Sequence, residues 1–368
     1  MDVAVVGGGL VGMATALSLV RRGLDVTVYE RDRDLGGHQS GNNSNVIHSG
    51  AFYVPGSLKA RLAVSGREML EDYVTAHGLP LARPGKLVVQ QRGEDARFNE
   101  LARRAGANGV AHEVLDSSEQ IAERAPGVTG ERALWLPDVA ITEFRAVLES
   151  LADDVRTLGG TVSLNGAGRF IGSRFAGKDR YVEPRHVIVA AGTGLGGLYP
   201  HGDWRIVGFR GSYRALRAPA IEPLVYGVPD PRYPFLGVHL TPTLDGRVLV
   251  GPNASMNLPM PLGRSMLAGL RNLRAGLREW RSGRRPASMQ RVLRRYVPDA
   301  EIAPEIVRSG VRAQAVDRWG RFADDFVLRE EPGITWVLNA PSPAATACLS
   351  IGEHLADGVV AKLAESPA

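Results

Sequence analysis

The sequence predicts an α/β protein of α+β, two-lobed type, with one Rossmann-like lobe and one lobe built on a mixed or antiparallel sheet. Two observations predict the first lobe: a strand–turn–helix–strand pattern over residues 2–30 and a buried strand at 186–193 that ends in small residues. The second lobe is indicated by residues 205–260, which contain short strands separated by turn signals. At 368 residues the chain exceeds one ordinary domain, so two hydrophobic cores are expected.

The first thirty residues carry a glycine-rich turn between a strand and a helix. Gly7 permits the tight turn, Gly9 lets the backbone approach a pyrophosphate, and Gly12 lets the helix pack closely on the strand. The N–H groups at the start of the helix face the phosphates. Glu30 ends the next strand, 18 residues after Gly12, where its carboxylate can accept both ribose hydroxyls. This pattern predicts a dinucleotide site.

The remaining elements follow from periodicity, caps and turn residues. The expected helices are 13–22, 58–76 with Ser57 as N-cap, 144–158 and 344–363, and the expected strands include 25–29, 86–91, 161–164, 186–193 and 335–340. We expect the strand at 186–193 to lie beside the first strand. The dinucleotide-binding lobe is then discontinuous, and the two lobes comprise residues 1–80, 140–200 and 305–368, and residues 81–139 and 201–304, respectively.

Composition narrows the class of protein. The net charge is +5, and 40 of the 44 basic residues are arginine, which we interpret as coding bias. There is no zinc-finger spacing and no aromatic–basic platform, so neither a metal site nor nucleic-acid binding is expected. No apolar run approaches the ~20 residues that span a bilayer. The single cysteine, Cys348, is expected to pack in the core of a cytoplasmic protein.

Three distant segments are directed to one extended ligand, which favours FAD over NAD. They are the glycine turn with Glu30, the strand end at Ala190–Gly192, and a second strand-to-helix junction at Pro341–Ala345. NAD enzymes of this kind usually need only the N-terminal unit. A helix N-terminus also stabilises the negative charge of a reduced flavin ring.

Several long motifs resemble the L-2-hydroxyglutarate oxidase/dehydrogenase family, which belongs to the D-amino-acid-oxidase-like superfamily. The motifs are His38–Gly50, Pro55–Leu62, Gly85–Val89, Val228–His239, Gly251–Ala254, Gly310–Gln314 and Asn339–Ala347. The resemblance covers nearly the whole chain. It implies an FAD-dependent enzyme that oxidises the C–OH of a small 2-hydroxy acid, or a related secondary alcohol, by hydride transfer to flavin N5.

The fingerprint and the resemblance together give a set of expected cofactor contacts. These are Gly7, Gly9, Leu10, Val11, Gly12, Glu30, Arg31, His38, Gln39, Asn43, Ser44, Ala191, Gly192, Gly310, Ser342, Pro343, Ala344, Ala345 and Thr346. The chain departs from the family at two positions in the first motif. Asn42 stands where the family usually has histidine, and Asn45 where it usually has glycine. Residues 163–186 are also shorter than the family's equivalent.

The proposed chemistry needs a base and a cation. Histidine suits the base because its pKa lies near neutrality, and His48 and His239 both lie inside family-like motifs. We expect one of them to be the base and the other to bind substrate, with Tyr53 in the same site. Arg312 ranks first for the substrate carboxylate because arginine offers a bidentate fork. The other expected substrate contacts are Lys59, Asn42 and Asn45, with Arg61 and Arg210 ranked after Lys59.

Residues 262–281 form an expected helix with an apolar stripe and an arginine-rich face. Two interpretations remain open. The first is a surface helix that packs its stripe inward. The second is peripheral contact with an anionic membrane, which suits an enzyme that passes electrons to a quinone. The sequence leaves oxygen or a quinone open as the electron acceptor.

Two alternative functions remain. An amine or amino-acid oxidase has the same fold and requires an aromatic cage or a carboxylate near the flavin. A flavin-binding scaffold without catalysis is suggested by Asn42 and by the short segment 163–186. His48, His239 and Arg312 argue against the scaffold.

Overall fold

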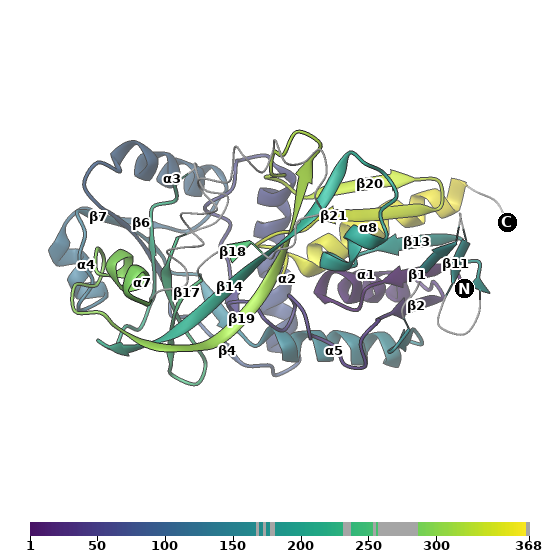
Figure 1. Cartoon of the computed structure of the whole chain (residues 1–368), viewed down its shortest axis with the longest axis horizontal. Helices are drawn as coiled ribbons and strands as arrows, with labels where there is room; N and C mark the ends of the chain where they lie inside the picture. Colours follow the sequence, from purple (N-terminus) through teal and green to yellow (C-terminus); the bar gives the residue numbers. More distant parts are fainter. Residues whose placement is uncertain are drawn as a thin grey trace.

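A computed structural model describes residues 1–166, 169–171, 174–176, 181–230, 237–252, 255–256 and 286–365. Two large sheets dominate the molecule (Figure 1). One is a parallel sheet covered by helices, and the other is a mixed sheet. The predicted α/β class is therefore confirmed.

The six-stranded sheet has its first strand near the middle. Its order is β20-β21-β13-β1-β2-β9, and all neighbouring pairs are parallel except β20 with β21. In chain order the strands are β1 (Val3–Val6), β2 (Val26–Tyr29), β9 (Thr161–Ser163), β13 (His186–Val189), β20 (Val327–Glu331) and β21 (Ile334–Asn339). The expected pairing of the first strand with the strand at 186–193 is confirmed.

Successive side chains of this sheet point to opposite faces and pack into two different hydrophobic cores. Val3 and Val5 face the helices, while Ala4 and Val6 face the opposite side with Trp336. The helix-side core contains α1 (Leu10–Arg21), α2 (Leu58–Ala76), α5 (Phe144–Thr157) and α8 (Cys348–Glu365). Helix α1 is buried along nearly its whole length because α5 and α8 both pack on it (Figure 1). The other face is covered by the 3₁₀ segment η1 (Gly192–Gly197).

The second sheet has the order β18-β14-β17-β16-β15-β5-β7-β6, and β19 pairs with β14. Its strands are β5 (Lys86–Gln90), β6 (Glu113–Leu115), β7 (Arg132–Leu136), β14 (Trp204–Ala218), β15 (Leu224–Gly227), β16 (His239–Pro242), β17 (Val248–Gly251), β18 (Ser255–Met256) and β19 (Glu301–Asp317). Helices α3 (Asp95–Ala107), α4 (Ser118–Arg124) and α7 (Pro286–Leu293) pack on it through two further cores.

The long strands β14 and β19 connect the two parts of the molecule (Figure 1). They pair from Trp204 with Asp317 to Ala218 with Glu301. Strand β19 crosses the expected boundary at residue 304, whereas β14 begins after the one at residue 200. The lobe boundaries expected from the sequence stay a prediction. Two three-stranded sheets complete the fold: β3 (Val46–Ile47), β8 (Ala140–Thr142) and β4 (Leu81–Ala82), and β10 (Arg169–Ile171), β11 (Arg174–Ala176) and β12 (Tyr181–Val182).

Most of the expected elements lie within a few residues of their predicted bounds. Ser57 caps α2 as predicted, accepting the Ala60 N–H at 3.1 Å. Cys348 is fully buried in the helix-side core, and burial raises the pKa of its thiol to about 12. The expected helix at 262–281 lies outside the described residues, as do parts of the motifs at 228–239 and 251–254. Among the helices that the structure describes, none has the length and apolar character required to span a bilayer.

Candidate active site

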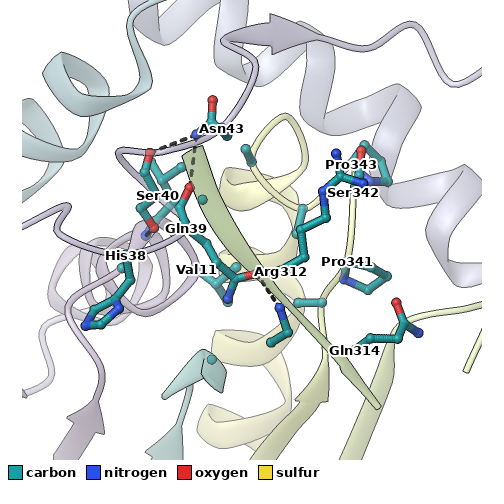
Figure 2. Close-up of a pocket in the computed structure, with 18 of the residues that line it drawn as sticks. Val11, His38, Gln39, Ser40, Asn43, Arg312, Gln314, Pro341, Ser342 and Pro343 are labelled. Carbon is teal, nitrogen blue, oxygen red and sulfur yellow. Dashed lines mark hydrogen bonds between the residues drawn. The ribbon is translucent and has the colours of Figure 1, made fainter. Parts of the chain in front are cut away.

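A cavity of about 970 Å³ lies where the carboxyl ends of the parallel strands meet the second sheet. Its lining includes five segments distant in sequence: the glycine turn, residues 30–54, the end of β13, β19 and the residues after β21. Residues of α3, β14, β15 and β16 also contribute to it. Figure 2 shows β19 with Arg312 between the loop of His38 and Asn43 and the segment of Ser342 and Pro343. The three segments expected to converge on one ligand therefore do meet at one cavity.

The glycine turn leaves no room for side chains. Gly7 has φ +110°, and a Cβ there would lie 2.4 Å from the carbonyl oxygen of Ala190. A Cβ at Gly12 would lie 2.0 Å from the carbonyl oxygen of Gly7. The turn is thus held against β13 and α1 with its backbone bordering the cavity.

The Glu30 carboxylate is held at the end of β2 by two backbone donors. Its Oε2 accepts the Gly8 N–H at 2.8 Å and its Oε1 accepts the Asp32 N–H at 3.0 Å. Arg31 and His38 lie beside it, with the Arg31 guanidinium 2.7 Å from the His38 ring. These residues line the cavity at the edge of the parallel sheet.

The loop at 38–45 is fixed to both α1 and β19. Ser40 Oγ accepts the Leu10 N–H at 3.0 Å at the start of α1. Gln39 Oε1 accepts the Ala313 N–H at 2.8 Å, and the Arg308 guanidinium donates to the Asn43 carbonyl at 2.9 Å. Figure 2 shows Gln39, Ser40 and Asn43 of this loop beside β19. The loop therefore closes one wall of the cavity without an element of regular structure.

The two departures from the family motif have local structural explanations. Asn45 adopts φ +60°, the left-handed region that favours glycine and that asparagine tolerates. Its side chain points to Glu143 at 2.9 Å and is buried. Asn42 donates its Nδ2 to the carbonyls of Gly37 and His38 and so caps the preceding turn. Asn42 lines the cavity and Asn45 lies outside its lining.

His48 and His239 lie in the same end of the cavity and are both held neutral. Burial is the main cause that lowers the pKa of His48 well below its usual value, followed by the positive charges of Lys86 and Arg312. Burial also lowers the pKa of His239 to about 3. Electrostatic repulsion from His239 also lowers the pKa of His48, so the two imidazoles are close enough to interact.

Tyr53, Lys59 and Arg312 line the same cavity. Burial raises the pKa of the Tyr53 phenol, and a hydrogen bond with Ser342 opposes this shift. The Lys59 ammonium donates to the Asp324 carbonyl and lies 5.4 Å from the centre of the Tyr53 ring. Lys59 is therefore engaged by the protein. Arg312 projects from the middle of β19 (Figure 2).

The segment after β21 forms the wall opposite the loop at 38–45. Residues 342–345 line the cavity. Thr346 lies behind them, where its Oγ1 accepts the His48 N–H at 3.0 Å and so fixes the backbone of that histidine. Helix α8 begins only at Cys348, because residues 343–347 form a turn closed by the Ala347 N–H and the Pro343 carbonyl. The expected helix start at 344 is thus four residues early.

The structure brings nearly all the predicted site residues to this cavity. Five of the predicted residues lie outside its lining: Gly12, Asn45, Arg61, Arg210 and Thr346. Gly310 borders the cavity where β19 crosses the loop at 38–45. The crossing is close, because a Cβ at Gly310 would lie 2.3 Å from the Asn42 carbonyl oxygen. The roles given to individual residues stay predictions.

Sequence reasoning missed Lys86 and Tyr226. Lys86 is fully buried at the start of β5, and its Nζ lies 4.3 Å from the centre of the Tyr226 ring. The sequence signal was a lysine at the head of the apolar run Lys86–Val89. A lysine in such a run stands out, because lysine is rarely buried without a partner. Tyr226 was hidden because a tyrosine in a strand is an ordinary core residue.

The cavity and its donors fit a flavin dinucleotide. The volume suits a large cofactor, a glycine turn exposes backbone at the start of α1, and a fixed carboxylate stands at the end of β2. Residues 2–358 match the family DAO, described as FAD dependent oxidoreductase. The chain belongs to this family, and it is an FAD-dependent oxidoreductase.

The chain is also similar to named relatives over nearly its whole length. The chain is 35% identical to a protein of Nematostella vectensis named L-2-hydroxyglutarate dehydrogenase, mitochondrial, over 97% of this chain and 90% of the relative. It is 34% identical to the human protein of the same name, over 97% and 88% of the two chains. A bacterial relative from Indibacter alkaliphilus, named L-2-hydroxyglutarate dehydrogenase, is 33% identical over 95% and 96%.

Solved structures show the same fold at lower identity. FAD-bound L-alpha-glycerophosphate oxidase from Mycoplasma pneumoniae aligns with a TM-score of 0.77 and 22% identity, over 98% of this chain and 94% of that one. Glycine oxidase from Geobacillus kaustophilus aligns with a TM-score of 0.74 and 18% identity, over 98% and 95%. The fold therefore serves both hydroxyl and amine oxidation, and the site must distinguish them.

Proposed function

We propose that this protein oxidises the C–OH group of a small 2-hydroxy acid, of the 2-hydroxyglutarate type, to the 2-oxo acid. The observation that carries the proposal is the end of the cavity where two neutral imidazoles meet the positive charges of Lys86 and Arg312. The names of the curated relatives support the same substrate class.

His239 is the better placed base. Its Nδ1 lies 2.8 Å from the Gly237 carbonyl, which can only accept, so Nδ1 carries the proton. In the neutral ring, Nε2 is then left with a lone pair. The hydroxyl proton of the substrate moves to this Nε2 as the C–H bond breaks. When bound, FAD supplies the acceptor that takes the hydride from the same carbon.

Arg312 binds the carboxylate next to the reacting carbon in this account. It projects from β19 beside Ser342 and Pro343, opposite the loop at 38–45 (Figure 2). A guanidinium holds a carboxylate through two parallel hydrogen bonds, which fixes the direction of the C–H bond. His48, whose backbone N–H is tied to Thr346, completes the polar side of the pocket.

An amine or amino-acid substrate fits this site less well. The charges that perturb His48 and His239 all come from cations or from the other imidazole, and all lower the pKa of both rings. The same positive potential repels a substrate ammonium group. Cavity-lining carboxylates do exist, for example Glu100 and Asp230, but neither is among the causes of these shifts.

The electron acceptor and location belong to the proposal as well. Oxygen or a quinone is the electron acceptor. The protein resides in the cytoplasm, and the alternative to a purely cytoplasmic protein is peripheral contact with an anionic membrane through residues 262–281. Pelleting with anionic liposomes at low salt tests the membrane contact, and protein that stays in the supernatant contradicts it. Several animal relatives carry the word mitochondrial in their names.

An anaerobic bleaching screen tests the proposed function. The FAD-loaded enzyme is mixed without oxygen with both enantiomers of 2-hydroxyglutarate, with lactate and with L-glutamate, which has the same skeleton and an amine at C2. We expect one 2-hydroxyglutarate enantiomer to bleach the flavin fastest and L-glutamate to leave it oxidised. Bleaching by L-glutamate alone would support the amine oxidase. No bleaching by a broad panel would support a silent scaffold.

A further inference from the structure

Lys86 is the one lysine that the described structure buries completely. It begins β5, with no exposed surface, and its Nζ has no hydrogen-bond partner within the described residues. Burying an ammonium without a partner is unfavourable by several kcal/mol. Neither the proton transfer to His239 nor the carboxylate contact of Arg312 involves the Lys86 amine directly, so its burial needs an explanation.

Lys86, Tyr226 and His239 form a row of side chains on three neighbouring strands. Lys86 is set two residues along β5 from Val88, the register partner of Tyr226, and it does not itself line the cavity. In the sheet, β15 lies between β16 and β5. Val225 pairs with Leu240, so the next pair sets Tyr226 opposite His239. The two rings stack with centroids 3.8 Å apart at 16°. On the β5 side, Lys86 Nζ lies 4.3 Å from the same Tyr226 centroid. Tyr226 is therefore between the imidazole and the ammonium.

This row lies directly under the cavity. Tyr226 and His239 line it, as does Phe52, whose ring centre is 5.1 Å from Lys86 Nζ. Two aromatic rings thus cover the ammonium on the side of the cavity. Aromatic faces stabilise a cation only partly and cannot replace the three hydrogen bonds that an ammonium donates.

Among the residues that the structure describes, none gives Lys86 a compensating negative charge. Burial is the only cause that shifts its pKa, which falls to about 7. The titratable and charged groups that surround the row are phenols, imidazoles and a guanidinium, namely His48, Tyr53, Tyr213, Tyr226, His239 and Arg312. A negative charge that enters the cavity is therefore the counter-charge that this site lacks.

We propose that Lys86 is a specificity-determining residue, whose buried amine provides the positive charge for the carboxylate remote from the reacting carbon and takes up a proton when a dicarboxylate binds. The inference rests on the proposed function and deepens it, because Arg312 accounts for the carboxylate next to the hydroxyl. A substrate with two carboxylates then meets two cations, and a monocarboxylate leaves the Lys86 site without its anion.

Binding of inert anions to the wild-type holoenzyme tests this without any variant. Glutarate and butyrate, which have two carboxylates and one, are titrated by calorimetry at pH 8.5 in buffers of different ionisation enthalpy. We expect glutarate to bring about one proton per flavin at pH 8.5 and close to none at pH 6, where Lys86 is already charged. Butyrate brings far less. Glutarate binding without proton uptake, or no binding of glutarate, overturns the inference.

Variants separate Lys86 from other proton acceptors. Lys86→Met and Lys86→Gln should abolish the uptake and weaken glutarate binding about 10- to 100-fold, with less than about threefold effect on butyrate. Lys362→Met is the control, because Lys362 lies on α8 and its Nζ already pairs with Glu330 Oε2 of β20 at 2.9 Å. Uptake that persists in either Lys86 variant contradicts the inference.

The outcome is independent of the proposed reaction. Bleaching by 2-hydroxy acids together with unchanged proton uptake in the variants would remove only the role of Lys86. Absence of bleaching together with Lys86-dependent uptake would remove only the proposed function.

Discussion

Replacing Lys86 by methionine should stabilise the protein in a pH-dependent way. Burial lowers the pKa of the ammonium from 10.5 to about 7 in the folded chain, and the unfolded chain retains the ordinary value. Between these values the unfolded state binds more protons, so the free energy of unfolding of the wild type rises with pH. Each pKa unit corresponds to about 1.4 kcal/mol, which gives about 5 kcal/mol in total.

The variant lacks this titration, so its advantage is greatest in acid. We expect Lys86→Met to exceed the wild type by about 5 kcal/mol at pH 6 and by about 1 kcal/mol at pH 9.5. For a chain of this length the difference at pH 6 raises the unfolding midpoint by about 6 °C. Thermal unfolding followed by flavin fluorescence from pH 6 to 9.5 measures it, with Lys362→Met as control. An advantage that does not change with pH would refute the reasoning.

Three further predictions concern the cofactor and substrate ends of the cavity. Gly12→Ala places a methyl group 2.0 Å from the Gly7 carbonyl oxygen and should reduce the flavin content of the purified protein severalfold. The control Gly202→Ala meets open space and should retain the flavin. Equal ratios of flavin to protein absorbance in the two variants contradict this prediction. His239→Asn should lower kcat for the bleaching substrate by about 10²–10⁴-fold with flavin retained, and a loss below tenfold would exclude it as the base. Arg312→Lys should raise KM for a 2-hydroxy acid about tenfold or more, because the bidentate contact is lost, and steady-state rates that give an unchanged KM would argue against its role.

The parts of the fold that the sequence predicts best are locally encoded. The glycine turn, α1 and β2 follow from spacing alone. Gly12 is required by a contact with Gly7 in the same unit, although Gly7 itself is required by a contact with the distant Ala190. The Ser57 cap and the burial of Cys348 are similarly local or compositional. The same logic identifies FAD, since three segments end at one edge of the parallel sheet.

The parts that the sequence does not predict depend on distant pairing. Strand β19 runs for 17 residues with exposed stretches and no regular alternation, and it is stabilised by β14, about a hundred residues earlier. Its position brings Arg312 to the cavity, which motif resemblance alone could suggest. Lys86 was missed because a charged residue at the start of a strand is usually solvated. The structure shows that it lies behind Tyr226: the register of β5 and β15 sets Lys86 opposite Leu224, two residues from Tyr226, and its side chain reaches the Tyr226 ring.

A single-turnover experiment without oxygen shows whether this protein oxidises a 2-hydroxy acid. The FAD-loaded enzyme is mixed with a limiting amount of 2-hydroxyglutarate, and both the flavin absorbance and the 2-oxo acid are quantified. We expect each flavin bleached to yield one molecule of 2-oxoglutarate, and we expect the yield to collapse in His239→Asn. A flavin that stays oxidised with either enantiomer, or that is bleached without formation of the 2-oxo acid, would contradict it.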